Sequence, residues 1–97
     1  MRVSVRFFTV LREITNKKEE MLQFPESEKV TVKTVLKTLS NRYGKLFDEY
    51  VYDPQTEIIK EFLQFLINGK SISALNGLNS DLYDNDVLAI VPPVGGG

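Results

Sequence analysis

The sequence predicts an α+β fold in which a mixed sheet of about five strands packs against one main α-helix. An alternating segment at the start and an apolar segment at 86–91 have the pattern of strands. Apolar residues recur at helical spacing over 32–43. Asn68-Gly69 is the strongest short signal for a hairpin turn. Because a single helix covers only one face of such a sheet, we expect the other face to be partly exposed.

Composition limits the functions available to the chain. Its 97 residues suit a single domain, and the net charge of −1 without a basic block argues against nucleic acid as a partner. No apolar run approaches the roughly 20 residues of a membrane span, and residues 1–6 do not resemble a signal peptide, so we expect a cytoplasmic protein. The chain has no cysteine and no histidine, which excludes disulfides, Cys/His zinc sites and imidazole catalysis. We expect no bound metal and no autonomous enzyme.

The N-terminal segment predicts two paired strands. Val3, Val5 and Phe7 alternate with polar residues, which places Phe8 on the polar face, either as an ordinary exposed aromatic or as a partner contact. A short helical turn is expected from Thr9, as N-cap, to Ile14, with its apolar side made by Val10, Leu11 and Ile14. The second strand covers Glu19 to Phe24, and Pro25 ends it.

The main helix is predicted from Val32 to Tyr43. Its apolar stripe consists of Val32, Val35, Leu36, Leu39 and Tyr43. Thr31 is suited to be its N-cap, and Gly44 stands where a left-handed residue ends a helix. We interpret this stripe as core.

The stretch from Leu46 to Lys60 has two interpretations. Phe47, Tyr50 and Tyr52 could form a short turn of helix over a satellite core, or the stretch could be a mobile insertion. Asp53-Pro54-Gln55-Thr56 predicts a turn.

The third strand is expected at Phe62 to Ile67, followed by a type I′ turn at Asn68-Gly69 and a short return strand at Ser71-Ile72. A second turn covers 76–79, and Leu82 and Tyr83 are expected to anchor it. The acids Asp81, Asp84 and Asp86 lack the spacing of a metal-binding loop, so we interpret them as turn formers and solvated charge.

The last strand, Asp86 to Val91, leads into Pro92-Pro93-Val94-Gly95-Gly96-Gly97. Proline cannot donate to a sheet ladder, and glycine has no side chain to pack, so we divide the chain into a domain at 1–91 and a flexible tail at 92–97. Val94 to Gly97 spans about 13 Å when extended, enough to reach a buried active site of another protein. The carboxylate of Gly97 is ionised at neutral pH and is a competent nucleophile.

Three stretches resemble the ubiquitin-like sulfur carriers of the MoaD/ThiS type, most closely the small subunit of molybdopterin synthase. Phe7-Phe8 followed by Val10-Leu11-Arg12-Glu13-Ile14 is similar to the family's paired aromatics and its aliphatic-Arg-Glu-aliphatic turn. Leu66-Ile67-Asn68-Gly69 resembles its Asn-containing hairpin, and 86–97 resembles its final strand, Pro-Pro and terminal Gly-Gly.

The resemblance implies a ubiquitin-like β-grasp fold and a sulfur carrier. An E1-like enzyme of the MoeB/ThiF type would adenylate Gly97 with ATP and Mg²⁺, and a sulfur donor would convert it to a thiocarboxylate. The tail would then enter a large subunit of the MoaE type, which builds the dithiolene of the pterin cofactor for molybdenum or tungsten. By position, Gly97 is the reacting residue and Gly96 keeps the tail thin. We expect partner contacts from Phe8, Val91, Pro92, Pro93, Val94 and Gly95, and no cofactor bound by the chain itself.

Other functions remain open at this point. The chain could be a protein modifier joined to lysines through Gly97, or a sulfur carrier for thiazole synthesis or tRNA thiolation. It could also be a binding module whose tail has no chemical role.

Overall fold

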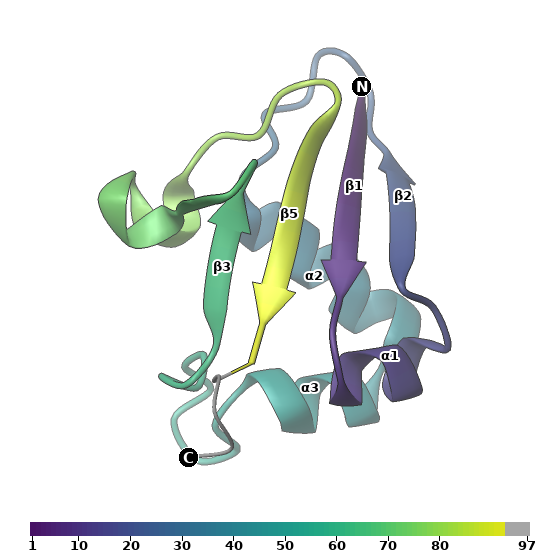
Figure 1. The fold of residues 1–97 in the computed structure, drawn as a ribbon, viewed down its shortest axis with the longest axis vertical. Helices are drawn as coiled ribbons and strands as arrows, with labels where there is room; N and C mark the ends of the chain where they lie inside the picture. Colours follow the sequence, from purple (N-terminus) through teal and green to yellow (C-terminus); the bar gives the residue numbers. More distant parts are fainter. Residues whose placement is uncertain (93–97) are drawn as a thin grey trace.

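A computed structural model describes residues 1–92, and these fold into a five-stranded mixed sheet with one long helix across one face (Figure 1). The strands are β1 (Arg2–Phe7), β2 (Glu19–Gln23), β3 (Gln64–Ile67), β4 (Lys70–Ser71) and β5 (Asp86–Val91). The helices are α1 (Val10–Thr15), α2 (Val32–Tyr43) and α3 (Lys45–Val51), with 3₁₀ turns η1 (Ile72–Ala74) and η2 (Gly77–Asn79). No helix in the described part of the chain is long and apolar enough to cross a membrane. The predictions for Pro93 to Gly97 lie outside the described residues.

The strand order is β2-β1-β5-β3-β4, with β1 and β5 parallel and every other pair antiparallel. This is the predicted ubiquitin-like β-grasp arrangement, in which the first and last strands lie side by side at the centre of the sheet. The core forms between the sheet and the helices. From the sheet it takes Val3, Val5, Phe7, Leu22, Phe65, Ile67, Leu88 and Ile90, and from α2 it takes Val32, Val35, Leu36 and Leu39.

The bounds and the N-cap predicted for α2 are confirmed. Thr31 accepts a hydrogen bond from the Thr34 backbone N–H, and the Thr34 hydroxyl accepts one from the Thr31 N–H, which together make a capping box. Gly44 ends the helix with a φ of 71°, which glycine adopts at little steric cost, but its ψ of −141° differs from that of the predicted left-handed residue. Tyr43, the last residue of the predicted stripe, is half-buried.

The region around α1 differs in detail from the prediction. Thr9 occupies the N-cap position but makes no side-chain cap hydrogen bond. Leu11 is buried and Ile14 half-buried, whereas Val10 is 40% exposed and is not part of the apolar side. The predicted pairing of β1 with β2 is confirmed, with Val3 opposite Leu22.

Residues 45–51 form helix α3, so the interpretation of this stretch as a mobile insertion is wrong. Phe47 and Val51 are fully buried and belong to the main core, not to a satellite cluster. The polar loop that follows is closed by Asp53, whose carboxylate accepts from the Gln55 and Thr56 N–H groups. The third strand starts later than predicted, at Gln64, and Phe62 is exposed beside Tyr50.

The turns that follow β3 are built by short polar side chains. Asn68 and Gly69 have φ values of 50° and 85°, as the type I′ prediction requires. The return strand is Lys70–Ser71, one residue earlier than predicted, because Ile72 turns into η1.

Leu82 is buried as expected, but Tyr83 is 67% exposed, so its predicted anchoring role is wrong. Asp86 accepts from the backbone N–H of Tyr83, which is the turn-forming role predicted for it. Asp84 accepts instead from the N–H of Arg2 and so ties this loop to the start of β1.

Candidate functional site

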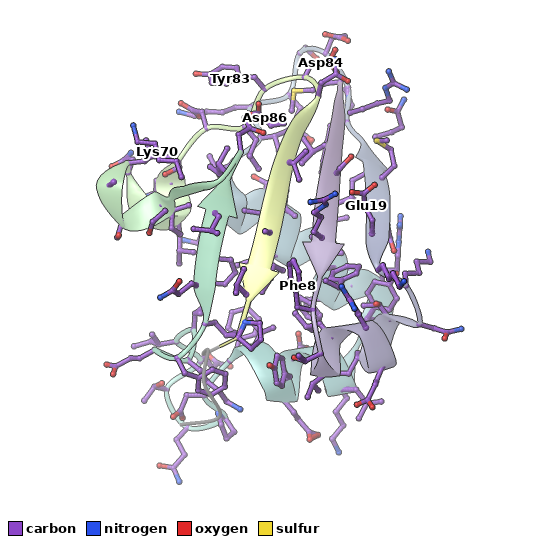
Figure 2. All side chains as sticks on the ribbon, in the orientation of Figure 1. Phe8, Glu19, Lys70, Tyr83, Asp84 and Asp86 are labelled. Atoms are coloured by element: carbon purple, nitrogen blue, oxygen red, sulfur yellow. The ribbon has the colours of Figure 1, made fainter. Side chains whose placement is uncertain are left out.

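The structure places Phe8 beside the root of the tail. In the parallel pair, Phe7 lies opposite Ile90, so Phe8 lies one step further, level with Val91 at the carboxyl ends of both strands. Figure 2 shows Phe8 at this end of the sheet. Phe8, Val91 and Pro92 are all half-buried, which leaves part of each accessible. Of the residues predicted to contact a partner, the structure describes Phe8, Val91 and Pro92, and it brings these three together.

The face of the sheet opposite α2 continues this accessible apolar surface. Because Leu88 and Ile90 are fully buried against the core, Val87, Ala89 and Val91 point to the other face. Leu66 of β3 lies opposite Ala89. We name the accessible set the tail-root patch: Phe8, Leu66, Val87, Ala89, Val91 and Pro92. Its location on the uncovered face supports a docking role.

Charged residues border the patch on the β1 and β2 side. Arg6 lies opposite Ala89, and its Nε donates to a Glu19 carboxylate oxygen at 3.2 Å. The Arg12 guanidinium carbon lies 5.4 Å from the centre of the Phe8 ring, and Arg12 Nε donates to the Phe7 carbonyl at 3.0 Å. The ring of Phe8 is therefore held by a cation–π contact beside the end of β1.

A cluster of ionisable groups around Glu20 lies away from the tail-root patch, on the helix side of β2. Glu20 is 5% exposed and accepts hydrogen bonds from Lys17, Arg42 and Tyr43. Burial would raise the pKa of Glu20, but these hydrogen bonds and the charge of Arg42 outweigh it and hold that pKa below its ordinary value of 4.5. Burial and the bond to Glu20 raise the pKa of Tyr43. This cluster joins β2 to α2, so we assign it a structural role.

The geometry of residues 1–92 supports docking at the patch. Within that range, no three His, Cys, Asp or Glu side chains gather as a metal site would require. Sequence reasoning missed Leu66 and Arg12 as members or neighbours of the site. Both lie in stretches that resemble the family, but the place of Leu66 in the site depends on the pairing of β3 with β5 and that of Arg12 on the turn after β1.

A β-grasp body with an uncovered apolar patch where the last strand ends defines the class of ubiquitin-like carrier proteins. Residues 5–97 match the family model described as ThiS family, and the chain belongs to that family of ubiquitin-like sulfur carriers. It is 30% identical over 97 residues to small archaeal modifier protein 3 of Haloferax volcanii, with 100% of each chain covered.

Solved structures agree with this fold. The solution structure of small archaeal modifier protein 1 from Methanosarcina acetivorans has a TM-score of 0.81 and 34% identity, covering 99% of this chain and 96% of that one. A putative molybdopterin converting factor subunit 1 from Pyrococcus furiosus has a TM-score of 0.72 at 24% identity, covering 97% and 99%, and supports the fold alone.

Proposed function

We propose that the chain carries sulfur as a thiocarboxylate on Gly97 and delivers it for assembly of the pterin dithiolene of the molybdenum or tungsten cofactor. The observation that carries this proposal is the tail-root patch, which gives partner enzymes a surface continuous with Val91 and Pro92. Membership of the ThiS family supports sulfur carriage as the general activity. The pterin as the destination rests on the resemblance to the small subunit of molybdopterin synthase.

The chemistry needs two steps at the carbonyl carbon of Gly97. First, a carboxylate oxygen attacks the α-phosphorus of ATP on an E1-like enzyme with Mg²⁺, which forms an acyl-adenylate and releases pyrophosphate. Sulfur at the oxidation level of sulfide then attacks the carbonyl carbon. The bond between this carbon and the bridging phosphate oxygen breaks, and AMP leaves. Side chains at Gly96 or Gly97 would widen the tail, so we assign these glycines the role of entering a narrow active site.

The folded body supplies binding energy that the thin tail cannot supply. The apolar side chains of the tail-root patch would be covered by the adenylating enzyme and, after sulfur loading, by a large subunit that uses the sulfur. Both partners need the same reacting end, so we expect them to compete for one patch. Arg12 and Arg6 at its border favour partners with acidic residues around an apolar centre.

Reconstitution tests this proposal. The chain is incubated with the E1-like enzyme of its own cell, ATP, Mg²⁺ and sulfide, and the product is followed by intact mass. We expect the replacement of one oxygen by sulfur at Gly97. Leu66→Glu should slow loading about tenfold or more by placing a charge in the patch, whereas Lys70→Glu, on the neighbouring strand, should not. Sulfur loading that is equally fast in Leu66→Glu would refute the role of the patch.

The choice of acceptor is tested separately. The thiocarboxylated chain is mixed with a molybdopterin synthase large subunit and a sulfur-free pterin precursor, and dithiolene formation is measured. If sulfur is transferred to a thiazole precursor or to tRNA instead, the chain is a sulfur carrier for one of those pathways and not for the pterin.

A second candidate function is conjugation to proteins. It is favoured by the full-length match to small archaeal modifier protein 3 and by the 34% identity to small archaeal modifier protein 1. The same acyl-adenylate would be attacked by a lysine amine, which forms an isopeptide bond and releases AMP. Digests of cell extracts should then contain lysines that carry glycine remnants of this tail, and they should vanish when Gly97 is deleted. Extracts without such lysines under any growth condition would exclude this function.

A further inference from the structure

The outer edge of β2 offers unpaired backbone groups to another strand. β2 is the last strand on its side of the sheet (Figure 1). Met1 and Phe24 exchange two backbone hydrogen bonds, and the Phe7 N–H donates to the Lys18 carbonyl. Hydrogen-bonded pairs alternate along an antiparallel ladder, so Leu22 and Glu20 also face β1. The N–H and C=O groups of Glu19, Met21 and Gln23 therefore point away from the sheet.

The features that protect this edge are confined to its start, where Glu19 is an exposed charge and Glu20 an inward-pointing one. Between residues 19 and 23 there is no lysine, proline or glycine, and no positive φ that would mark a bulge. At its centre Met21 is 51% exposed on the open face of the sheet. An extended segment could thus pair with β2 without displacing any part of the described chain.

A hollow of about 740 Å³ lies beside this edge, between β2 and helix α2. The last turn of α2 lies next to β2, because Arg42 and Tyr43 bind Glu20 of that strand, and the helix crosses obliquely behind the sheet (Figure 1). Thr34, Thr38 and Asn41 line the hollow with polar groups, and Lys33 and Lys37 stand one helical turn apart at its rim. The hollow is therefore polar, with two lysines on its α2 side and one acid, Glu28, on the loop that follows β2.

The charge at this rim is not neutralised by close ion pairs. Among residues 1–92, no carboxylate lies within 4.0 Å of Lys33 or Lys37, and α2 itself contains no acidic residue. Lys29 adds a third exposed cation, loosely paired with Asp81 at 3.8 Å. The acids Asp48, Glu49, Asp53 and Glu57 lie across a separate hollow on the α3 side of the two lysines.

We propose that the edge of β2 binds an extended acidic segment of a partner protein by strand addition. The residue opposite Met21 would point to the open face, where an apolar side chain can cover the methionine. The residues opposite Leu22 and Phe24 would point to the α2 side, where carboxylates meet Lys33 and Lys37. The preferred segment therefore alternates acidic and apolar residues.

A second copy of this chain is a poorer occupant. Pairing two β2 edges about a two-fold axis would put both α2 helices on the same face of a continuous sheet. Both helices carry lysine and arginine and no acidic residue, so like charges of the two copies would gather on one face and repel. An acidic partner removes this repulsion and uses the same backbone groups.

Titration of a synthetic peptide tests the proposal. A peptide of alternating Glu and Val is added to the full ¹⁵N-labelled chain, and amide shifts and hydrogen exchange are recorded. We expect shifts and slowed exchange at the amides of Glu19, Met21 and Gln23. Combined Lys33→Glu and Lys37→Glu substitution should weaken binding by roughly tenfold or more, and added salt should weaken binding to the unsubstituted chain. The matched control is Lys45→Glu, an exposed lysine of α3, which should bind as before.

Two further variants distinguish pairing at the β2 edge from binding at the tail or at the lysines alone. A Met21→Pro chain lacks the outward N–H but keeps every ladder bond to β1, so it should lose binding if it stays folded. A chain without Gly96 and Gly97 should bind the peptide unchanged, because the edge acts independently of sulfur loading. A peptide with its Glu residues in one block should bind more weakly than the alternating one.

Three results would each overturn the proposal. The first is unchanged affinity in the double lysine variant, and the second is amide shifts confined to the tail-root patch. The third is a dimer of the chain that protects these amides without peptide.

Discussion

Thr9 has a backbone conformation that a β-branched residue rarely adopts. Its φ is 45° and its ψ is −116°, close to the first central position of a type II′ turn, and the Leu11 N–H closes this turn on the Phe8 carbonyl at 3.1 Å. That position favours glycine, and strain of this kind costs about 1–3 kcal/mol. The turn reverses the chain directly after Phe8, so the strain lies next to the tail-root patch.

Thr9→Gly should therefore stabilise the protein. Glycine also gives the unfolded chain more conformational entropy, which costs about 0.4–1 kcal/mol of stability. The free energy gained by relieving the strain is larger, so we expect the free energy of unfolding to rise by roughly 1 kcal/mol. Thermal unfolding measures it as a raised Tm. Ser27→Gly, at an exposed position without positive φ, is the control and should lower the Tm slightly. A lower Tm for Thr9→Gly would contradict the strained turn.

Glu20 makes the stability of the folded protein depend on pH in the acidic range. Its pKa is lower in the folded protein than its ordinary value of 4.5, so below that pH the unfolded chain binds more protons than the folded one. The contribution of Glu20 to the free energy of unfolding is thus fully present above about pH 5, and it is lost as pH falls through the pKa that Glu20 has in the folded protein.

Glu20→Gln should lower the free energy of unfolding at neutral pH by about 1–3 kcal/mol, because Arg42 and Lys17 lose their shared carboxylate. Denaturant titrations between about pH 3 and 7 should then show a smaller loss of stability in the variant than in the wild type as pH falls. The matched control is Glu19→Gln, one residue along on the exposed face, which should follow the wild type closely. Parallel pH curves for Glu20→Gln and the wild type would rule out this role for Glu20.

At the scale of elements, local patterns predicted what local interactions determine. The bounds of α2 follow from Thr31, the apolar stripe and Gly44, and the hairpin follows from Asn68-Gly69. Sequence reasoning did not predict that the Asn68 side chain also binds Asp86 and the Val87 N–H, which ties the hairpin to β5. That link depends on the neighbouring strand, 18 residues away in the sequence.

Helix α3 could not be decided from sequence because its register depends on the core it completes. Phe47 is fully buried, whereas the adjacent Leu46 is 65% exposed, and both are strongly apolar. Phe47→Ala should cost about 3–5 kcal/mol of stability by leaving a cavity. Leu46→Ala should stay within about 0.5 kcal/mol of the wild type in the same denaturant titration. Equal effects of the two substitutions would mean that α3 does not pack as described.

At the scale of the whole molecule, the site is a consequence of topology. The alternation of apolar residues in β1 and β5 identified Phe8 and Val91 separately, but only the parallel pairing of the two strands makes them neighbours. The order β1-β5-β3 then adds Leu66 from the other side. The sequence could predict most members of the tail-root patch, and the arrangement of strands explains why they form one surface where the last strand ends.

The intact mass of the protein purified from its own cells, with fragmentation to locate any change, tests the central claim most directly. We expect a fraction of molecules in which one oxygen of the Gly97 carboxylate is replaced by sulfur, or in which Gly97 is joined to a lysine of another protein. A chain that always carries an unmodified carboxylate, or that is modified at another residue while Gly97 stays unchanged, would contradict the proposal.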